Sequence, residues 1–406
     1  MNTLNLSRRS FVQLSGAVAA SAVLAGCGGG SSDGGSASND GTTFKIGGIG
    51  PVTGAAAIYG NATKYGAQVA IDEVNAAGTI KMDLNWQDDE HDPEKSVNAY
   101  NTLKDWGMQI LVGTTTTTPC VAVSTETNAD RIFELTPSAS SVNVIGGEEI
   151  GADNPRKDNV FQMCFTDPNQ GTASAQYIAD KKLGTKIAII YNNADAYSTG
   201  IYQKFIDESK ALNLDIVSTQ TFTDDQTDFS VQVGDAKSKG ADLLFLPIYY
   251  TPASLILAEA KKQDYAPKFF GVDGMDGILT LEGFDTALAE GVMLLTPFVA
   301  TAEDDATKAF VEAYKKAAGT SENPNQFAAD AYDCVKAIAQ AIEAAGITPD
   351  MTASDICDAL IAQFTDSSFT YSGLTGESSW STTGEVTKTP KGMVIENGIY
   401  MPLDEE

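Results

Sequence analysis

The sequence is poor in positive charge. Its 406 residues hold 26 Lys and Arg against 54 Asp and Glu, which gives a formal net charge of −28. A surface this negative repels phosphate backbones and anionic lipid head groups. We therefore expect no nucleic-acid partner, and no membrane contact except through an attached anchor.

Residues for acid–base chemistry are also scarce. The one histidine is His91, so any Ser-His-Asp or Cys-His catalytic arrangement would have to use it. It stands between Glu90 and Asp92 in a turn after an expected strand, which is typical of a solvated loop histidine. From Phe44 onward there is no Gly-x-Ser-x-Gly elbow between an expected strand and helix. These absences predict a protein that is not an enzyme and that uses no cofactor.

Long apolar runs are absent behind the N-terminus, where a bilayer span would need roughly 18 to 20 such residues. Residues 1–26 contain no acid, two bases at Arg8 and Arg9, and an apolar run from Leu14 to Gly26. The run is too short to span a membrane and ends in small residues. This pattern predicts an export signal, by either the general or the twin-arginine route.

Cys27 follows directly on Leu24-Ala25-Gly26, a setting similar to a bacterial lipobox. We expect Cys27 to be acylated and to become the mature N-terminus, on the outer face of the cytoplasmic membrane or in the periplasm. Residues 27–43, rich in Gly and Ser, then predict a flexible tether.

The other four cysteines show no Cys-x-x-Cys spacing and no histidine partner, so no metal site is expected. In an exported protein they are free to form disulfides. Cys334 and Cys357 lie on consecutive amphipathic helices, and we expect this pair to be bridged. The alternative is four buried free thiols that act as small hydrophobic groups.

From Phe44 onward, short apolar runs alternate with helical patterns, which is typical of an α/β fold with parallel sheets covered on both faces. Two such series predict two doubly wound lobes in tandem. Residues 304–364 are mostly helical in pattern, and the tail has hairpin turns at Thr383-Gly384 and Asn397-Gly398. The expected strands are Phe44–Ile49, Met82–Trp86, Met108–Val112, Arg131–Leu135, a strand near Val160, Lys186–Tyr191, Ile216–Phe222, Ala241–Ile248 and Lys268–Gly271.

Gly48-Ile49-Gly50 follows the first strand and is superficially like a dinucleotide fingerprint. The third glycine position is Thr53, and no isolated acid follows at the expected distance. We interpret these glycines as a loop that lets a ligand approach the backbone closely.

A run of threonines from Thr114 to Thr118 follows another expected strand and precedes Pro119. Proline favours the first helical position, so we expect Thr118 to be the N-cap. Hydroxyls at a helix N-terminus favour an anion, although a polar loop is the alternative. Residues 136–141 form a second hydroxyl cluster at the end of the next strand, and ligands bind at such carboxyl ends in open parallel sheets.

Several segments together resemble the Leu/Ile/Val-binding family of ABC transporter substrate-binding proteins, which have the type I periplasmic binding protein fold. The resemblance covers nearly the whole mature chain. It implies two lobes joined by three crossovers, with residues 44–163 plus 298–374 in the first lobe and 164–297 plus 375–406 in the second. The segments that carry it are Gly50–Gly54, Tyr59-Gly60, Asp88-Asp89, Asp92-Pro93, Gly113–Thr118, Thr136–Ser140, Asp167–Gly171, Ile187–Tyr191, Tyr197, Tyr249-Tyr250 and Gly271–Gly274.

The resemblance also implies a site for an amino acid. A hydroxyl at Thr117 and nearby backbone N–H groups would hold the carboxylate. The Ser138 backbone, the Ser140 hydroxyl and Asp273 from the second lobe would hold the ammonium, with Asp276 as an alternative acid. The ligand-binding residues expected in this way are Tyr59, Thr116, Thr117, Ser138, Ala139, Ser140, Tyr197, Tyr249 and Asp273.

Two departures from the family stand out. Well-known members carry glutamate where Asp273 stands, and some have a disulfide between the positions of His91 and Thr116, neither of which is cysteine here. The expected function is capture of an amino acid, branched-chain or similar, for delivery to ABC permease subunits. The alternatives are a short amide or urea as ligand, a sensory subunit of a receptor, and an extracellular hydrolase.

Overall fold

The computed structural model describes residues 41–147, 154–388 and 390–403. The expected signal peptide and Cys27 lie outside these residues. Within the described ranges, no helix combines the length and the apolar character that crossing a membrane requires.

The first lobe is built on a five-stranded parallel sheet with the order β2-β1-β3-β4-β5. Its short strands are largely apolar and mostly buried, as expected for a sheet covered on both faces. The strands are β1 (Phe44–Ile49), β2 (Met82–Gln87), β3 (Ile110–Val112), β4 (Phe133–Thr136) and β5 (Val160–Gln162). The helices are α1 (Ala57–Ala77), α2 (Pro93–Trp106), α3 (Thr117–Asp130), α4 (Val142–Ile145), α9 (Asp305–Ala318), α10 (Gln326–Ala345) and α11 (Ala353–Phe364).

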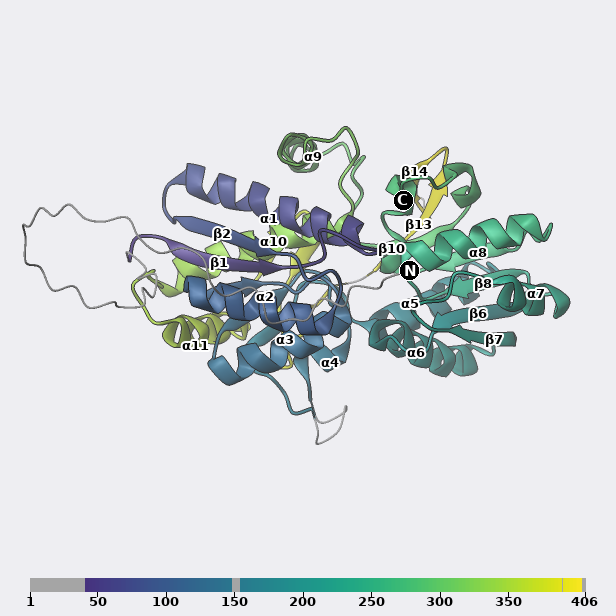
Figure 1. Cartoon of the computed structure of the whole chain (residues 1–406), viewed down its shortest axis with the longest axis horizontal. Helices are drawn as coiled ribbons and strands as arrows, with labels where there is room; N and C mark the ends of the chain where they lie inside the picture. The colour runs from purple at the N-terminus through teal and green to yellow at the C-terminus, as the bar shows by residue number, and fades with distance from the viewer. Residues whose placement is uncertain (1–40, 148–153, 389, 404–406) are drawn as a thin grey trace, which may run out of the picture. The chain divides into compact units, whose positions relative to one another are not determined.

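The second lobe repeats the same order in its parallel strands, β7-β6-β8-β9-β10, and adds β13 and β14 antiparallel at one edge. Figure 1 shows α5 to α8 around this sheet. The strands are β6 (Ile187–Asn192), β7 (Ile216–Phe222), β8 (Leu243–Leu246), β9 (Lys268–Gly271), β10 (Met293–Thr296), β13 (Lys391–Glu396) and β14 (Ile399–Pro402). The helices are α5 (Asp167–Asp180), α6 (Ala196–Leu212), α7 (Ser230–Ser238), α8 (Tyr250–Lys262) and the 3₁₀ turns η2 (Asp273–Met275), η3 (Ile278–Thr280) and η4 (Thr286–Ala289).

Three segments cross between the lobes: β5 to α5, β10 to α9, and the segment before β13. The α9–α11 region therefore returns to the first lobe, where α10 packs along α1 (Figure 1). One continuous apolar cluster contains Tyr59 of α1, Phe327 of α10 and Leu244 of β8, so side chains of both lobes share a core.

The third crossing lies further along the chain than the expected boundary at residues 374 and 375. Strand β11 (Tyr371–Gly373) pairs with β12 (Gly376–Ser378), and Trp380 belongs to the first-lobe core. Its indole nitrogen donates to the carbonyl of Gln162 at 2.8 Å. These contacts hold residues 375–388 against the first lobe.

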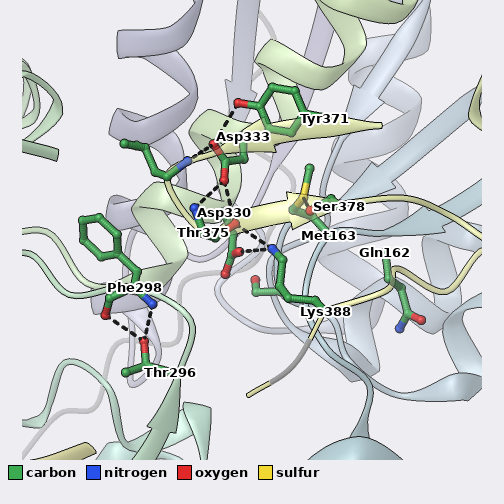
Figure 2. Close-up of polar contacts among 12 residues, drawn as sticks. Gln162, Met163, Thr296, Phe298, Asp330, Asp333, Tyr371, Thr375, Ser378 and Lys388 are labelled. Atoms are coloured by element: carbon green, nitrogen blue, oxygen red, sulfur yellow. Dashed lines mark hydrogen bonds and ion pairs between the residues drawn. The ribbon is translucent and has the colours of Figure 1, made fainter. Parts of the chain in front are cut away.

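A buried ion pair anchors the end of this segment (Figure 2). The Lys388 ammonium lies 3.1 Å from Asp330 Oδ1 and 2.6 Å from the Thr375 hydroxyl, and both charged side chains are at most 3% exposed. Beside them, Asp333 accepts hydrogen bonds from the Tyr371 hydroxyl and from Thr375. The chain thus leaves the first lobe from a fixed point just before β13.

Three other sequence-based expectations differ from the structure. Helix α3 begins at Thr117 with Thr116 as its N-cap, instead of capping at Thr118. Strand β10 had not been expected, because a four-residue apolar run carries little periodicity. The expectation of a Cys334–Cys357 disulfide is wrong, because both residues are free, buried thiols in the first-lobe core. Cys120 and Cys164 are also free and buried.

Candidate functional site

A small pocket lies where the lobes meet. The space left between its side chains is about 10 Å³, enough for about one water molecule. Three of its side chains are tyrosines that fill most of the cleft. The residues that line it are Tyr59, Thr115, Thr116, Ser138, Tyr197, Tyr249, Asp273, Gly274 and Phe327.

The first lobe contributes hydroxyls and a helix N-terminus. Thr116 is the N-cap of α3, and its side chain makes no capping hydrogen bond to the helix. The neighbouring Ser138 hydroxyl donates to the carbonyl of Thr115 at 2.6 Å, which ties together the loops that follow β3 and β4. Hydroxyls and the free N–H groups of a helix N-terminus are suited to hold a carboxylate.

His91 supports this loop, contrary to the expectation of a solvated histidine. Its Nδ1 lies 2.8 Å from the Thr116 hydroxyl, and its ring packs edge-on against Tyr249 with centroids 5.8 Å apart. Desolvation lowers the pKa of His91, which favours the neutral form of the ring. The two positions that some relatives are expected to bridge by a disulfide thus meet here through a hydrogen bond.

The second lobe contributes a buried acid and two stacked rings. Asp273 follows β9 in the 3₁₀ turn η2, and its Oδ1 accepts a hydrogen bond from the Tyr197 hydroxyl at 2.6 Å. The rings of Tyr197 and Tyr249 stack with centroids 4.7 Å apart. Desolvation raises the pKa of Asp273 to about 7, against the opposing effect of the hydrogen bond from the Tyr197 hydroxyl. A buried carboxyl of this kind is stabilised by a cation.

Tyr59 bridges the lobes. Its hydroxyl donates to the carbonyl of Gly274 and accepts from the backbone N–H of Tyr250 at 3.3 Å. Nearby, the Tyr250 hydroxyl donates to the carbonyl of Ala55 at 2.9 Å. On the other side of the pocket, the Thr118 hydroxyl donates to Asp195 at 3.3 Å. The structure is therefore a form in which the lobes touch.

Of the nine site residues expected from the sequence, six line the pocket and three do not. Thr117, Ala139 and Ser140 are buried beside it. Thr115, Gly274 and Phe327 also line it, although they are not among the nine expected ligand-binding residues. Phe327 comes from a distant helix of the first lobe, and no local sequence signal connects it with the threonine loop.

A group of buried polar atoms without partners lies behind the pocket. Both carboxylate oxygens of Asp167, the Ser140 hydroxyl and the Gln170 Nε2 make no hydrogen bond in the structure. The backbone N–H of Asp167 donates to the carbonyl of Ser140 at 3.0 Å, so the group joins both lobes. Burial raises the pKa of Asp167 well above its ordinary value. This acid, next to the pocket, had not been predicted as a site residue.

Gly48, within β1, and Gly50, after it, make room for side chains of the first lobe. A Cβ on Gly48 would lie 2.1 Å from the Trp86 ring, and one on Gly50 would lie 2.1 Å from the Thr115 hydroxyl. Protein side chains therefore occupy the space beside these two glycines. Among the described residues, no group of His, Cys, Asp and Glu is arranged to hold a metal ion.

Comparison with known proteins identifies the family. A family model described as periplasmic binding protein matches residues 43–393. The chain belongs to the periplasmic binding protein family. It is a solute-binding protein of the ABC transporter type and not an enzyme, as the sequence predicted.

Relatives with the same architecture bind different solutes. A Leu/Ile/Val-binding protein homolog of Brucella melitensis is 27% identical over 308 residues, covering 75% of this chain and 80% of its own. The branched-chain amino acid substrate-binding protein of Streptococcus pneumoniae, solved with isoleucine, is 26% identical with a TM-score of 0.76, covering 88% of this chain and 97% of its own. A solute-binding protein of R. palustris, solved with benzoate, shares the fold at 16% identity and a TM-score of 0.75, covering 89% and 95%.

Proposed function

We propose that this protein captures a small amino acid between its lobes and delivers it to the permease subunits of an ABC importer. The observation that carries the proposal is Asp273, a buried acid from the second lobe that faces the hydroxyls of Thr116 and Ser138 across one pocket. An ammonium and a carboxylate on one ligand would complement these two sides. Such a ligand is neutral overall, so the net charge of the protein does not repel it.

The acids favour an amino acid over an aromatic acid. Benzoate, the ligand of one relative, is an anion with no cationic group. Placed here, it would face Asp273 and approach Asp167 and Asp195, and burying like charges together costs free energy. None of the described residues that line the pocket is an arginine or lysine that could offset that cost.

The size of the cleft favours a small ligand. Tyr59, Tyr197 and Tyr249 leave about 10 Å³ free, so any amino acid requires the lobes to open and the rings to move outward. A ligand of few heavy atoms needs the smallest displacement. Well-known relatives are expected to carry glutamate where Asp273 stands. The aspartate side chain is one methylene shorter, so its carboxylate extends less far toward a ligand ammonium. Glycine and alanine are therefore to be tested beside leucine and isoleucine.

A short amide or urea is the second candidate ligand, and the small volume of the pocket favours it. Urea donates hydrogen bonds to Asp273 and accepts one from Thr116, without a charge at either end. The two candidates differ in their dependence on the charge of Asp273. An ammonium requires the carboxylate, whereas an amide donor also binds to the carbonyl oxygen of asparagine.

The test is calorimetric titration of the wild type, Asp273→Ala, Asp273→Asn and Asp276→Asn with the common amino acids, urea, acetamide and benzoate. If an ammonium binds Asp273, Asp273→Ala loses one partner of a buried pair, which costs roughly 3–5 kcal/mol. At about 1.4 kcal/mol per tenfold, binding weakens on the order of a hundredfold to several thousandfold.

Asp276→Asn is the matched control, because Asp276 is equally buried three residues away and does not line the pocket. It should bind the amino acid nearly as the wild type does. A change of less than about fivefold in Asp273→Ala would contradict the proposed ammonium partner. Binding of benzoate in preference to every amino acid would contradict the ligand class.

The anchoring step completes the proposal. We propose that residues 1–26 are removed, that Cys27 carries the lipid, and that residues 27–43 tether the two lobes outside the cytoplasmic membrane. Cys27→Ala should move the protein from the membrane fraction to the soluble fraction. An unmodified Cys27 in the mass spectrum of the mature protein would contradict it. A receptor partner in place of a permease would be revealed by co-purification from membranes.

A further inference from the structure

A second and larger cavity lies at the crossovers, outside the proposed amino-acid site. Its volume is about 350 Å³, within the range of small-molecule sites. We call it the hinge pocket. Its walls come from α1, α9 and the α9–α10 loop of the first lobe, from the segment after η2 and from η3 of the second lobe, from the crossover after β10 and from the β13–β14 hairpin.

The lining of the hinge pocket is mainly apolar. Ile58, Leu279, Ala300, Tyr314 and Ile399 supply apolar surface. Ile399 is 42% exposed, one of the few large apolar side chains in the described residues that face solvent to this extent. Exposed apolar surface that is concave and contiguous marks a binding site more often than isolated apolar residues do.

Asp276 is the buried polar group of this cavity. Its side chain is 3% exposed, and its Oδ2 accepts a hydrogen bond from the backbone N–H of Gln326 at 2.8 Å. The other oxygen, Oδ1, makes no hydrogen bond. The Tyr400 hydroxyl lies close enough to favour the ionised form, but does not satisfy Oδ1.

Asp276 has no basic side chain as an ion-pair partner among the described residues. No lysine or arginine of the described residues forms an ion pair with it, and none lines the hinge pocket. Desolvation raises its pKa to about 6, which leaves the carboxyl mostly ionised at pH 7. A buried carboxylate with one free oxygen is stabilised by a donor that carries positive charge.

We propose that the hinge pocket is a second ligand site, for a small primary amine whose ammonium binds Asp276 Oδ1 and whose hydrocarbon body packs on Ile58, Leu279 and Ile399. The strong negative charge of the protein favours an organic cation over an anion here. The proposal does not depend on which solute binds between the lobes.

The position of the hinge pocket connects it to lobe movement. Ile58 of the first lobe touches Gly277 of the second, where an added Cβ would lie only 2.8 Å from the Ile58 side chain. Ile58 directly precedes Tyr59 in the sequence, and Asp276 follows three residues after Asp273. Tyr59 and Asp273 both line the cleft. An amine that contacts both walls stabilises the form in which they touch, so it should raise the affinity of the cleft for its solute.

The test uses three probes of similar shape and different charge: cyclohexylamine, cyclohexanol and cyclohexanecarboxylate. Each is titrated calorimetrically into the full chain at pH 7. The amine should bind at least about tenfold more tightly than the alcohol, and the carboxylate should not bind. Asp276→Asn keeps the size of the side chain and should weaken the amine at least tenfold, with no comparable effect on the alcohol.

Two further variants separate the possible outcomes. Ala300→Phe fills the cavity and should abolish binding of both the amine and the alcohol, which keeps the test valid if Asp276→Asn does not fold. Asp273→Asn removes the charge from the cleft and should leave amine binding unchanged. Amine affinity that is the same in the wild type, Asp276→Asn and Ala300→Phe overturns the proposal. Loss of amine binding in Asp273→Asn alone also overturns it, because the amine then binds in the cleft.

Discussion

The hydroxyl of Tyr59, on the first lobe, donates a hydrogen bond to the backbone carbonyl of Gly274, on the second lobe. The same oxygen accepts from the N–H of Tyr250. Tyr59 and Gly274 lie more than 200 positions apart in the sequence, and both line the proposed amino-acid site. Contact between the lobes and completion of the pocket are therefore made by the same side chain.

Removing this bridge should weaken solute binding. Tyr59→Phe keeps the ring, which packs edge-on against Phe327 with centroids 4.7 Å apart, and deletes only the hydroxyl. Loss of a hydrogen bond worth about 0.5–1.5 kcal/mol predicts about two- to twelvefold weaker binding. Titration calorimetry measures the affinity and small-angle X-ray scattering measures closure. Tyr65→Phe, on the same helix but outside the pocket, is the control, and equal affinities for all three proteins would contradict the prediction.

The ion pair between Lys388 and Asp330 should matter for stability. Lys388→Met leaves Asp330 buried and unpaired, which costs about 3–5 kcal/mol of the free energy of unfolding. The double variant Lys388→Met/Asp330→Leu removes both charges and should recover most of that loss. Urea unfolding of the wild type and of these two variants measures both effects. A single variant as stable as the wild type would show that the pair contributes nothing.

Glu134 should make stability depend on pH. Its carboxyl is fully buried and accepts hydrogen bonds from the Thr127 hydroxyl at 2.6 Å and the Cys120 thiol at 3.2 Å. Desolvation raises its pKa from 4.5 to about 7. The folded state therefore holds this proton more tightly than the unfolded state does, so the stability it contributes is present below pH 4.5 and is lost as pH rises through 7.

Glu134→Gln is neutral at every pH and should remove this part of the dependence. Relative to the wild type, the variant should gain stability between pH 5 and pH 8, as measured by the midpoint of urea unfolding. Asp72→Asn, at an exposed position on α1, serves as the control and should follow the wild type. Parallel curves for Glu134→Gln and the wild type would disprove the role of this carboxyl.

Counting free thiols distinguishes four free cysteines, as in the structure, from the expected Cys334–Cys357 disulfide. A Cys27→Ser variant unfolded without reductant should titrate four thiols, because Cys120, Cys164, Cys334 and Cys357 are all free. A bridge between Cys334 and Cys357 would leave two. Burial raises the pKa of Cys357 to about 12, so it should react only after unfolding.

Much of the architecture follows from local sequence. The strands Phe44–Ile49, Ile216–Phe222 and Lys268–Gly271 have the predicted bounds. Local sequence also accounts for the start of the helix Pro93–Trp106, because Asp92 caps it and Pro93 is its first residue. The turn at Asn397-Gly398 joins the β13–β14 hairpin as its sequence indicates. A residue of the proposed site could be predicted only where it stands at the end of an expected strand or in a motif that resembles the Leu/Ile/Val-binding family.

The sequence by itself determined the alternation of strands and helices, the two-lobe repeat and the shortage of catalytic side chains. Only the tertiary structure decided that Trp380 and Lys388 stay with the first lobe, that His91 meets Thr116, and that Asp273 and Asp276 face different cavities. The physical reason is that backbone preferences act over a few residues. Burial, the pairing of charges and the filling of space depend instead on neighbours that folding brings together from distant parts of the chain.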